Sequence, residues 1–418
     1  MSQSVSRLPV SRRHRLAAVL AGLVVPAGAF GSAMVLAVAI AALVASVAVP
    51  DRGRHARRVA LTALFHPLGL LCLAMLLLWL PNVFASPERL ETAKTWVRVA
   101  VVLAGSVYLF SVIDRNAELS ALARDSLLVG LTVVLVFSLT AIFAAPELVT
   151  SLRRSYLGPW LRYKAFASTL ACTAPLLLWM AWEHAGWRRI AAGLSLVLSA
   201  VMVIGTGSRA SVAGLAAAAV IALIFLALRK PRLRLPVLAA AGVVVVAVVA
   251  FLLHLGGRHA EDTGALGLPL WLIDIHRQHI WAFVIERLQE NLWFGHGLNA
   301  IAHIPGADHL IPGVDLAYVP SHPHNWMLEM LAEAGVLGFA PAAALVALLI
   351  GRDAAATAKA GAPRRAARLM LLIAFWVSAC FNFSIWAPWW GVTLCFLYLI
   401  VSARPEIPAA GPRRMLFA

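Results

Sequence analysis

The stretch that decides the fold runs from Pro236 to His254 and reads PVLAAAGVVVVAVVAFLLH, without one Asp, Glu, Lys or Arg. A run of about 17–25 apolar residues can cross the hydrocarbon core of a bilayer as a helix. Similar runs recur along all 418 residues, of which 61% are hydrophobic and 13% charged. Soluble domains usually carry about 25% charged residues. The chain is therefore predicted to be an all-α, polytopic membrane protein, with residues 1–418 forming a single integral membrane domain.

About twelve membrane spans are predicted. The first two share the apolar stretch 16–50, which is expected to break near Gly31. The others are expected at residues 59–80, 96–113, 125–144, 165–182, 190–205, 209–228, 236–254, 325–350, 367–385 and 389–403. Lys and Arg gather in alternate loops, as they do on the cytoplasmic side of membrane proteins. We therefore predict a multi-pass protein of the bacterial inner membrane with both termini cytoplasmic.

The net charge of +16 would suit a nucleic-acid partner in a soluble protein. Here the loop pattern accounts for it, so membrane lipids and no nucleic acid are the expected partners. The four cysteines fall within predicted spans and lack the spacing of metal ligands. They are predicted to be small core residues.

The longest loop covers residues 255–322 and is predicted to face the periplasm. A loop of this length in a compact protein is usually functional or disordered. Within it, Ile280, Trp281 and Val284 recur at helical spacing. An amphipathic helix is therefore predicted near residues 274–292, on the outer membrane surface or as a cap over the bundle.

The stretch 205–211 reads GTGSRAS and joins two predicted spans on the outer side. Arg209 begins the second span, directly after Ser208. The free N–H groups of a helix N-terminus favour phosphate, and an arginine adds bidentate recognition. The alternative is an interfacial arginine that ends the span and reaches toward lipid headgroups.

Arg277 lies at the edge of the apolar face of the predicted amphipathic helix, close to His276 and His279. An anion-binding arginine and an ordinary solvent-facing charge both fit this position. Nine of the 13 histidines lie between His254 and His324, which raises the question of a metal site. Because no HExxH or similar ligand spacing is present, no metal is expected.

The long loop re-enters the membrane at residues 321–338, which read SHPHNWMLEMLAEAGVLG. Asn325 suits the N-cap of the next span, so His324 is expected at the mouth of a helix. A neutral imidazole there could accept a proton from a hydroxyl group. Glu329 and Glu333 lie one turn apart inside the span and could orient a His or Arg or bind sugar hydroxyls. The alternative is a loop-end histidine beside two interfacial acids.

Four bases lie on the predicted outer side, against the general charge pattern: Arg153, Arg154, Arg162 and Lys164. They suggest an anionic partner there. The alternative is interfacial anchoring, because Tyr156, Trp160 and Tyr163 resemble the aromatic belt of membrane proteins.

Three motifs resemble, in the same order, those of the O-antigen ligase and polymerase superfamily. They are GTGSRAS at 205–211, RQHIW at 277–281 followed by the turn GHGLN at 295–299, and HNWMLE at 324–329 with the later Glu333 and Gly335. The resemblance covers roughly residues 163–338. The remaining predicted helices agree with the family in number and topology only.

The resemblance implies an inverting, metal-independent glycosyltransferase that needs no cofactor. The donor would be a glycan on a polyprenyl diphosphate carrier, and in a ligase the acceptor would be a hydroxyl of lipid A–core. His324 would be the general base, and Arg209 and Arg277 would bind the diphosphate at the periplasmic face. Supporting or substrate-binding roles are expected for Ser208, Trp281, His322, Asn325, Glu329, Glu333, Arg153, Arg154 and Arg162.

A ligase is favoured because the long loop lies between the ninth and tenth predicted spans, as is common among the family's ligases. A polymerase of O-antigen or exopolysaccharide and a protein O-glycosylating relative stay open as alternatives. A transporter of lipid-linked sugars is a further alternative from a different class. Transporters place charges near the bilayer midplane, whereas the polar residues here gather at one face.

Overall fold

The structure is a computed structural model that describes residues 10–47, 52–114, 116–152, 158–230, 232, 234–256, 262–360 and 362–403. Within these ranges the chain is built from helices, turns and loops, with two isolated β-bridges and no strand. The α-helices are α1 (Arg12–Leu23), α2 (Ser32–Val47), α3 (Arg52–Leu64), α4 (Pro67–Ala85), α5 (Arg89–Ile113), α6 (Ala117–Ala144), α7 (Pro146–Leu152), α8 (Lys164–Glu183), α9 (Trp187–Gly205), α10 (Arg209–Arg229), α11 (Arg234–Gly256), α12 (Ile275–Leu288), α13 (Trp326–Ala360), α14 (Pro363–Ala379) and α15 (Pro388–Ser402).

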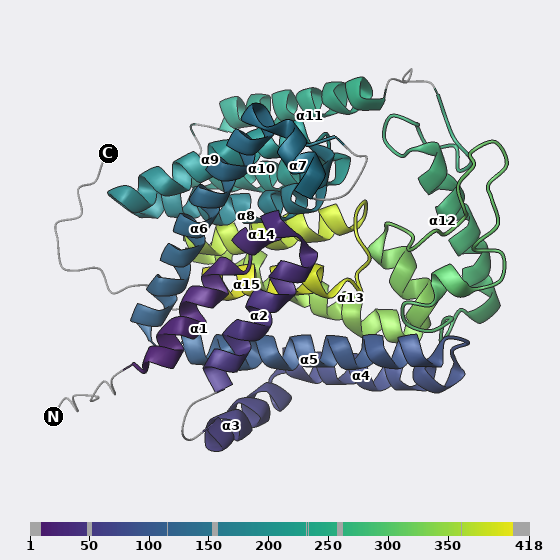
Figure 1. Cartoon of the computed structure of the whole chain (residues 1–418), viewed down its shortest axis with the longest axis horizontal. Coiled ribbons are helices and arrows are strands. Elements are labelled where there is room, and N and C mark those ends of the chain that lie inside the picture. Colours follow the sequence, from purple (N-terminus) through teal and green to yellow (C-terminus); the bar gives the residue numbers. More distant parts are fainter. Residues whose placement is uncertain are drawn as a thin grey trace.

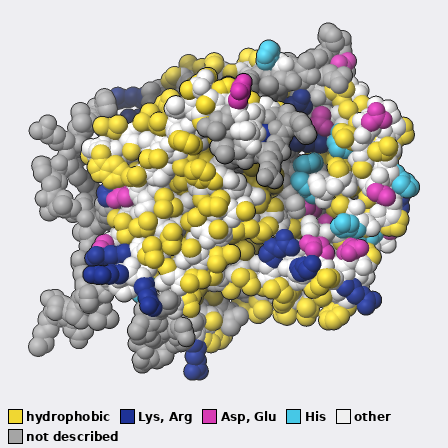
Figure 2. Space-filling model, viewed as in Figure 1, with side chains coloured by type: hydrophobic (Ala, Val, Ile, Leu, Met, Phe, Trp, Pro, Cys, Tyr) yellow, Lys and Arg dark blue, Asp and Glu magenta, His cyan; other side chains and the backbone are white. Residues whose placement is uncertain are grey.

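Seven helices in the described part of the chain are long and apolar enough to cross a membrane. They are α4, α5, α6, α8 together with the short helix η2 (Leu161–Tyr163) before it, α9, α10 and α13. The apolar helices α2 and α15 are shorter. Figure 2 shows apolar side chains over the middle of the visible face, with most charged side chains toward its two ends. The all-α, polytopic membrane fold is thus confirmed, whereas the count of twelve spans stays a prediction.

The centre of the bundle is α8, most of which is buried. It packs against α9, α10, α14 and α15. Its small polar residues Ser168, Thr169 and Thr173 are almost completely buried, and small side chains let neighbouring helix backbones approach closely. Helices farther out keep large apolar side chains exposed, such as Val133 on α6 and Ile190 on α9. In a membrane these outer faces would contact lipid.

The breaks between the first helices were partly predicted. Gly31 has a φ of 121° between α1 and α2, which confirms the break expected there. The predicted span at 59–80 is wrong in its position, because α3 ends at Leu64 and α4 begins at Pro67. A proline lacks the N–H that a helix interior needs but suits the first position of a helix. The His66 side chain caps α4 by accepting a hydrogen bond from Leu68 N at 3.2 Å.

Helix α13 contains a break at Gly335, whose φ of 65° is not helical. The loop at 292–297 runs along this break. Val336 N donates to Leu292 O at 2.9 Å, and Gly297 N donates to Glu333 O at 2.9 Å. A Cβ atom at position 335 would lie 2.3 Å from the backbone of Trp293, so only glycine fits. The break therefore fixes the second half of the long loop to the membrane helix.

The long segment between α11 and α13 forms one end of the molecule, with α12 at its outside, and α1 begins near the opposite end (Figure 1). Helix α12 packs against α13. Its apolar residues Ile280, Trp281 and Val284 are buried in a cluster with Ile301, and Ala332 of α13 belongs to the same cluster. The segment is thus a packed cap on the bundle.

Candidate active site

His324 occupies a turn of unusual backbone conformation at the start of α13. Its φ is 55°, a left-handed value that is uncommon for a residue other than glycine. Two contacts hold the turn. Trp281 Nε1 donates to Pro323 O at 2.9 Å, and Asn325 Oδ1 accepts from Met327 N at 3.1 Å. Asn325 therefore caps α13 as predicted, and Trp281 ties α12 to the His324 turn.

The backbone carbonyl of Asn382, just after α14, orients two histidines. His324 Nδ1 lies 2.8 Å from this oxygen, and His322 Nε2 lies 3.2 Å from it. A carbonyl oxygen only accepts hydrogen bonds, so each of these ring nitrogens carries the proton. His324 Nε2 then bears the lone pair of the neutral ring, as a proton acceptor requires. Ser321 Oγ can donate to His322 Nδ1 at 2.9 Å, which matches the same assignment.

Both histidines are held in the neutral form. Burial, then the neighbouring His322, the charge of Arg277 and that of Lys164 lower the pKa of His324 to about 3, although the hydrogen bond to Asn382 opposes this shift. Burial also lowers the pKa of His322, and the charge of Arg277 acts in the same direction. The two rings lie 4.1 Å apart between centroids. At neutral pH the pair is therefore uncharged.

Arg209 is the first residue of α10, and Ser208 is its N-cap. The Ser208 hydroxyl accepts from Ser211 N at 3.4 Å and from Ser211 Oγ at 2.7 Å. The Nη1 atom of Arg209 is buried and has no hydrogen-bond partner among the described residues. A buried donor on a charged group without a partner is costly, and an anion at this helix N-terminus would satisfy it.

Arg277 lies in the first turn of α12, where Asp274 is the N-cap. Asp274 accepts from Arg277 N at 3.0 Å, and its second oxygen lies 3.5 Å from Arg277 Nε. Burial and the charge of Arg209 lower the pKa of Arg277, whereas Asp274 raises it. The side chain is only 14% exposed, so Arg277 is not an ordinary solvent-facing charge.

These side chains come from four elements: α8, α10, α12 and the turn before α13. The charges of Arg209 and Arg277 act on one another, and those of Arg277 and Lys164 act on His324. Arg209 also acts on Lys164, so the three cations lie near one another, and two of them lie near the neutral histidine. Asp274 is the carboxylate that acts on Arg277 and Lys164. Such an arrangement could bind an anion next to a proton acceptor.

A chain of buried polar groups connects the two sides of this site. Asn382 Nδ2 donates to Ser168 Oγ at 2.7 Å, and Ser168 Oγ lies 2.9 Å from Ser211 Oγ. Ser211 in turn bonds to Ser208, the cap of the helix that begins with Arg209. The residue that orients His324 is thus tied, through α8, to the helix that presents Arg209.

Glu329 and Glu333 are both buried, and their hydrogen bonds go to loops of the protein. Glu329 accepts from Ser384 Oγ and from Ile385 N, the latter at 2.9 Å. Glu333 accepts from Asn299 N at 2.7 Å, from Ile301 N at 3.0 Å and from Trp386 Nε1. The two carboxylates therefore fasten the turns around the site to α13. None of these bonds involves a histidine or an arginine.

The structure gives less support for the other predicted site residues. Arg153 and Arg154 lie outside the described residues. Arg162 lies in η2, is only 8% exposed and already interacts with another group of the protein. Its side chain is therefore not available at the surface. Among the described residues no group of three His, Cys, Asp or Glu side chains could hold a metal ion.

Residues 194–343 match the family model described as O-Antigen ligase. The resemblance to the O-antigen ligase family is confirmed. A protein of Rickettsia prowazekii (strain Madrid E), provisionally named as a polysaccharide ligase, is 26% identical over 138 residues. A protein of Rickettsia typhi (strain ATCC VR-144 / Wilmington) with the same kind of provisional name is also 26% identical over 138 residues. Each match covers 32% of this chain and 33% of the relative, so the chain matches about a third of the length of these relatives.

The matched segment contains Arg209, Arg277 and His324 but ends before Asn382. Asn382 and Ser168 were missed by the sequence analysis. Asn382 acts on His324 through its backbone oxygen, which every residue has, so no side-chain pattern could reveal it. Ser168 is one of several small polar residues in an apolar span, where packing alone explains them.

Proposed function

We propose that this protein transfers a glycan from a polyprenyl diphosphate carrier to an acceptor hydroxyl, with lipid A–core as the acceptor. One observation carries the proposal: Arg209 and Arg277 lie at helix N-termini and act on one another, and Arg277 also acts on His324, a neutral histidine with a free Nε2. The likeness to the O-antigen ligase family over residues 194–343 supports the same chemistry.

In this mechanism His324 Nε2 removes the proton from the acceptor hydroxyl. The acceptor oxygen attacks the anomeric carbon on the face opposite to the diphosphate, and the configuration at that carbon inverts. The bond between the anomeric carbon and the diphosphate oxygen breaks, and its electron pair stays on the leaving diphosphate. The products are a new glycoside and free polyprenyl diphosphate. General-base help of this kind contributes about 10²–10⁴-fold to a rate.

Arg209 and Arg277 recognise the diphosphate before the reaction and stabilise its charge as it leaves. A diphosphate diester is an anion whose oxygens accept hydrogen bonds from guanidinium groups and from free N–H groups at helix starts. The charge on the bridging oxygen grows in the transition state, so fixed cations stabilise that state more than the bound donor. Lys164 adds a third positive charge close by.

Binding of the donor also prepares His324. In the free protein its pKa is about 3, chiefly because of burial, and the neighbouring His322 and the charges of Arg277 and Lys164 lower it further. A base of such low pKa accepts a proton weakly at neutral pH. Bound diphosphate would offset those positive charges and raise the pKa of His324 toward the range where a general base is effective. The bound donor would therefore strengthen the base that deprotonates the acceptor.

We place the acceptor against α12 and the loop around it. A cavity of about 310 Å³ lies beside α12 and is lined by eight residues that include Phe283, Glu286 and Tyr318. Phe283 and Tyr318 are stacked, with centroids 5.3 Å apart. Aromatic faces next to carboxylate and imidazole groups suit the mixed polar and apolar surface of a sugar. Other acceptors, including a growing glycan in a polymerase, would use the same surface.

The test is a transfer assay with purified protein, polyprenyl diphosphate-linked glycan and lipid A–core, in which wild type is compared with His324→Gln. We expect wild type to form glycosylated lipid A–core and the variant to lose activity while it still binds the donor. His296→Gln is the matched control, because the His296 ring bonds to Arg287 O at 2.9 Å on a neighbouring turn.

Each other outcome has a definite meaning. Elongation of the lipid-linked glycan without modification of lipid A–core would identify a polymerase that uses the same site. Full activity of His324→Gln would reject the general base. Movement of the lipid-linked glycan across vesicles without transfer would favour a transporter.

A further inference from the structure

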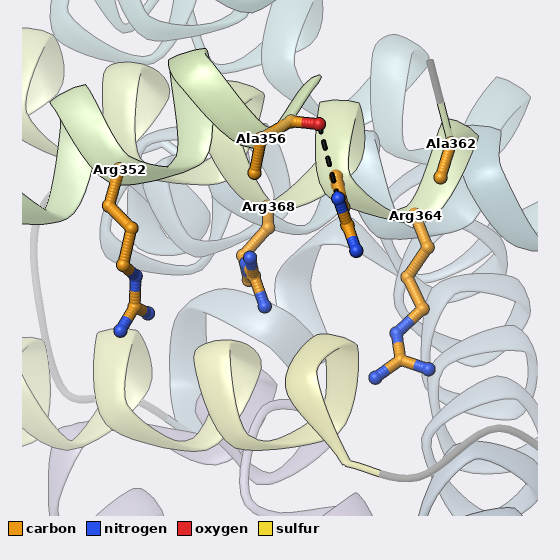
Figure 3. A pocket seen from close by; sticks show the side chains of 6 residues that line it. Arg352, Ala356, Ala362, Arg364 and Arg368 are labelled. Carbon is orange, nitrogen blue, oxygen red and sulfur yellow. Dashed lines mark hydrogen bonds between the residues drawn. The ribbon is translucent and has the colours of Figure 1, made fainter. Parts of the chain in front are cut away.

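The end of α13 farthest from His324 contains a second cluster of cations. Helix α13 continues from the break at Gly335 to Arg352 over roughly 25 Å, at about 1.5 Å per residue. A cavity of about 460 Å³ opens there. Its lining consists of Arg352, Ala356, Ala362, Arg364, Arg365 and Arg368. Figure 3 shows Arg352, Arg364 and Arg368 extending from α13 and α14 into the same space beside α15.

The protein itself uses only part of the hydrogen-bonding capacity of these arginines. Arg364 donates to Val401 O at 2.7 Å and to Ser402 O at 2.5 Å, and so caps the end of α15. Arg365 donates to Ala356 O at 3.3 Å. A guanidinium group has more N–H donors than such contacts use. The remaining donors are available to an anion in the cavity.

The negative charges near the cluster lie outside the lining. Asp353 is fully buried and forms an ion pair with Arg368, and its oxygen lies 3.9 Å from Arg352 Nε. Asp114 and Glu183 act electrostatically on Arg364. Among the described residues, the lining therefore contains four guanidinium groups and two alanines but no carboxylate.

An exposed apolar side chain lies near this basic cavity. Leu348 lies one helical turn before Arg352 on the same face of α13 and is 49% exposed. The cavity is also at the level where α13 ends, α14 begins and α15 ends. A ligand that fits must place an anionic group among the arginines and an apolar part along the helices. Free phosphate satisfies only the first of these two conditions.

We propose that this cavity binds the phosphate headgroup of an anionic phospholipid, at the end of the bundle opposite His324. Basic pockets between membrane helices on the cytoplasmic side are a known setting for anionic lipid headgroups. The volume is within the range of roughly 300–1,000 Å³ of ordinary ligand sites. The acyl chains would lie along α13 near the exposed side chain of Leu348.

The experiment measures binding to purified protein in detergent, by the thermal unfolding midpoint and by native mass spectrometry. The probes are dioleoyl phosphatidylglycerol, dioleoyl phosphatidylcholine and inorganic phosphate. The test variant is Arg352→Gln with Arg365→Gln, because neither residue caps α15. The control is Arg57→Gln with Arg58→Gln, which removes the same charge from exposed residues of α3.

Phosphatidylglycerol is expected to raise the unfolding midpoint of wild type and control, and phosphatidylcholine and phosphate are expected to leave it unchanged. The apparent dissociation constant for phosphatidylglycerol should be roughly thirtyfold higher for the test variant than for wild type. Each basic residue near an anionic headgroup contributes about fivefold to the affinity. If the double variant does not fold, Arg365→Gln alone should lose about fivefold. Equal binding by wild type and variant, an equal shift with phosphatidylcholine, or arginine-dependent binding of inorganic phosphate alone would overturn the proposal.

Discussion

Replacement of Arg277 by glutamine tests the anion site most directly. The side chain of Arg277 is 14% exposed, so its contact with a bound diphosphate would be largely shielded from water. A hydrogen bond to a charged group contributes about 1.5–3 kcal/mol, which corresponds to roughly 10–150-fold in an equilibrium or rate. Arg277→Gln should therefore reduce kcat/KM for the donor by about two orders of magnitude. The Arg277 N–H that bonds to Asp274 is a backbone group and stays in place.

The assay follows transfer from polyprenyl diphosphate-linked glycan to lipid A–core at limiting donor concentration. Arg188→Gln is the matched control, because Arg188 lies on α9, outside the proposed site, and pairs with Asp125. The control should retain near wild-type activity. If Arg277→Gln stays within about threefold of wild type while it is correctly folded, a charge-assisted bond to the donor is ruled out, since even the weakest such bond gives about tenfold.

Three further predictions concern the surroundings of His324. Because its pKa in the free protein is about 3, His324 stays neutral from pH 5 to 8. The value of kcat/KM for the donor, measured over this range, should therefore not fall toward low pH because of this residue. Ser168→Val removes the nearer of the two acceptors of Asn382 Nδ2, the other being Ser378 Oγ at 3.4 Å, and should lower kcat by about tenfold with little change in donor KM. Thr169→Val next to it should leave kcat unchanged, and kinetic assays of both variants would show the difference. Glu333→Ala leaves three donors unpaired and should cost several kcal/mol, on the order of 1–3 kcal/mol for each, as a lower thermal midpoint than that of the exposed-site control Glu286→Ala.

Contradictory results would be equally specific. An acid limb near pH 6 in kcat/KM that disappears in His324→Gln would show that the free histidine is not held neutral. If Ser168→Val and Thr169→Val have equal kinetics, the buried polar groups that include Ser168 do not help to position His324. An unchanged midpoint for Glu333→Ala would show that its three bonds do not hold the turns.

Local signals in the sequence predicted much of the helical framework. The start of α10 at Arg209 and the cap of α13 at Asn325 follow from residue types that favour helix starts. The apolar face of α12 follows from spacing. These features depend on residues a few positions apart. For that reason they could be recognised without knowledge of the rest of the fold.

Other features depend on residues far apart in the chain. The break at Gly335 could not be predicted, because glycine is common in membrane helices and usually leaves them intact. It becomes necessary only where the loop around Trp293 approaches the helix backbone. The roles of Glu329 and Glu333 were uncertain for the same reason: their partners are backbone groups of separate loops.

The charge arrangement at the site links substrate order to chemistry. Without donor, Arg209, Arg277 and Lys164 outnumber the carboxylate of Asp274, and His324 is kept neutral but weakly basic. Binding of an acceptor alone would bring a hydroxyl to a base that hardly attracts its proton. Binding of the diphosphate first satisfies the unpaired Arg209 donor and also strengthens the base. In the proposed mechanism the cations that hold the donor add to the effect of burial in keeping His324 a weak base, which favours an order in which the donor binds first.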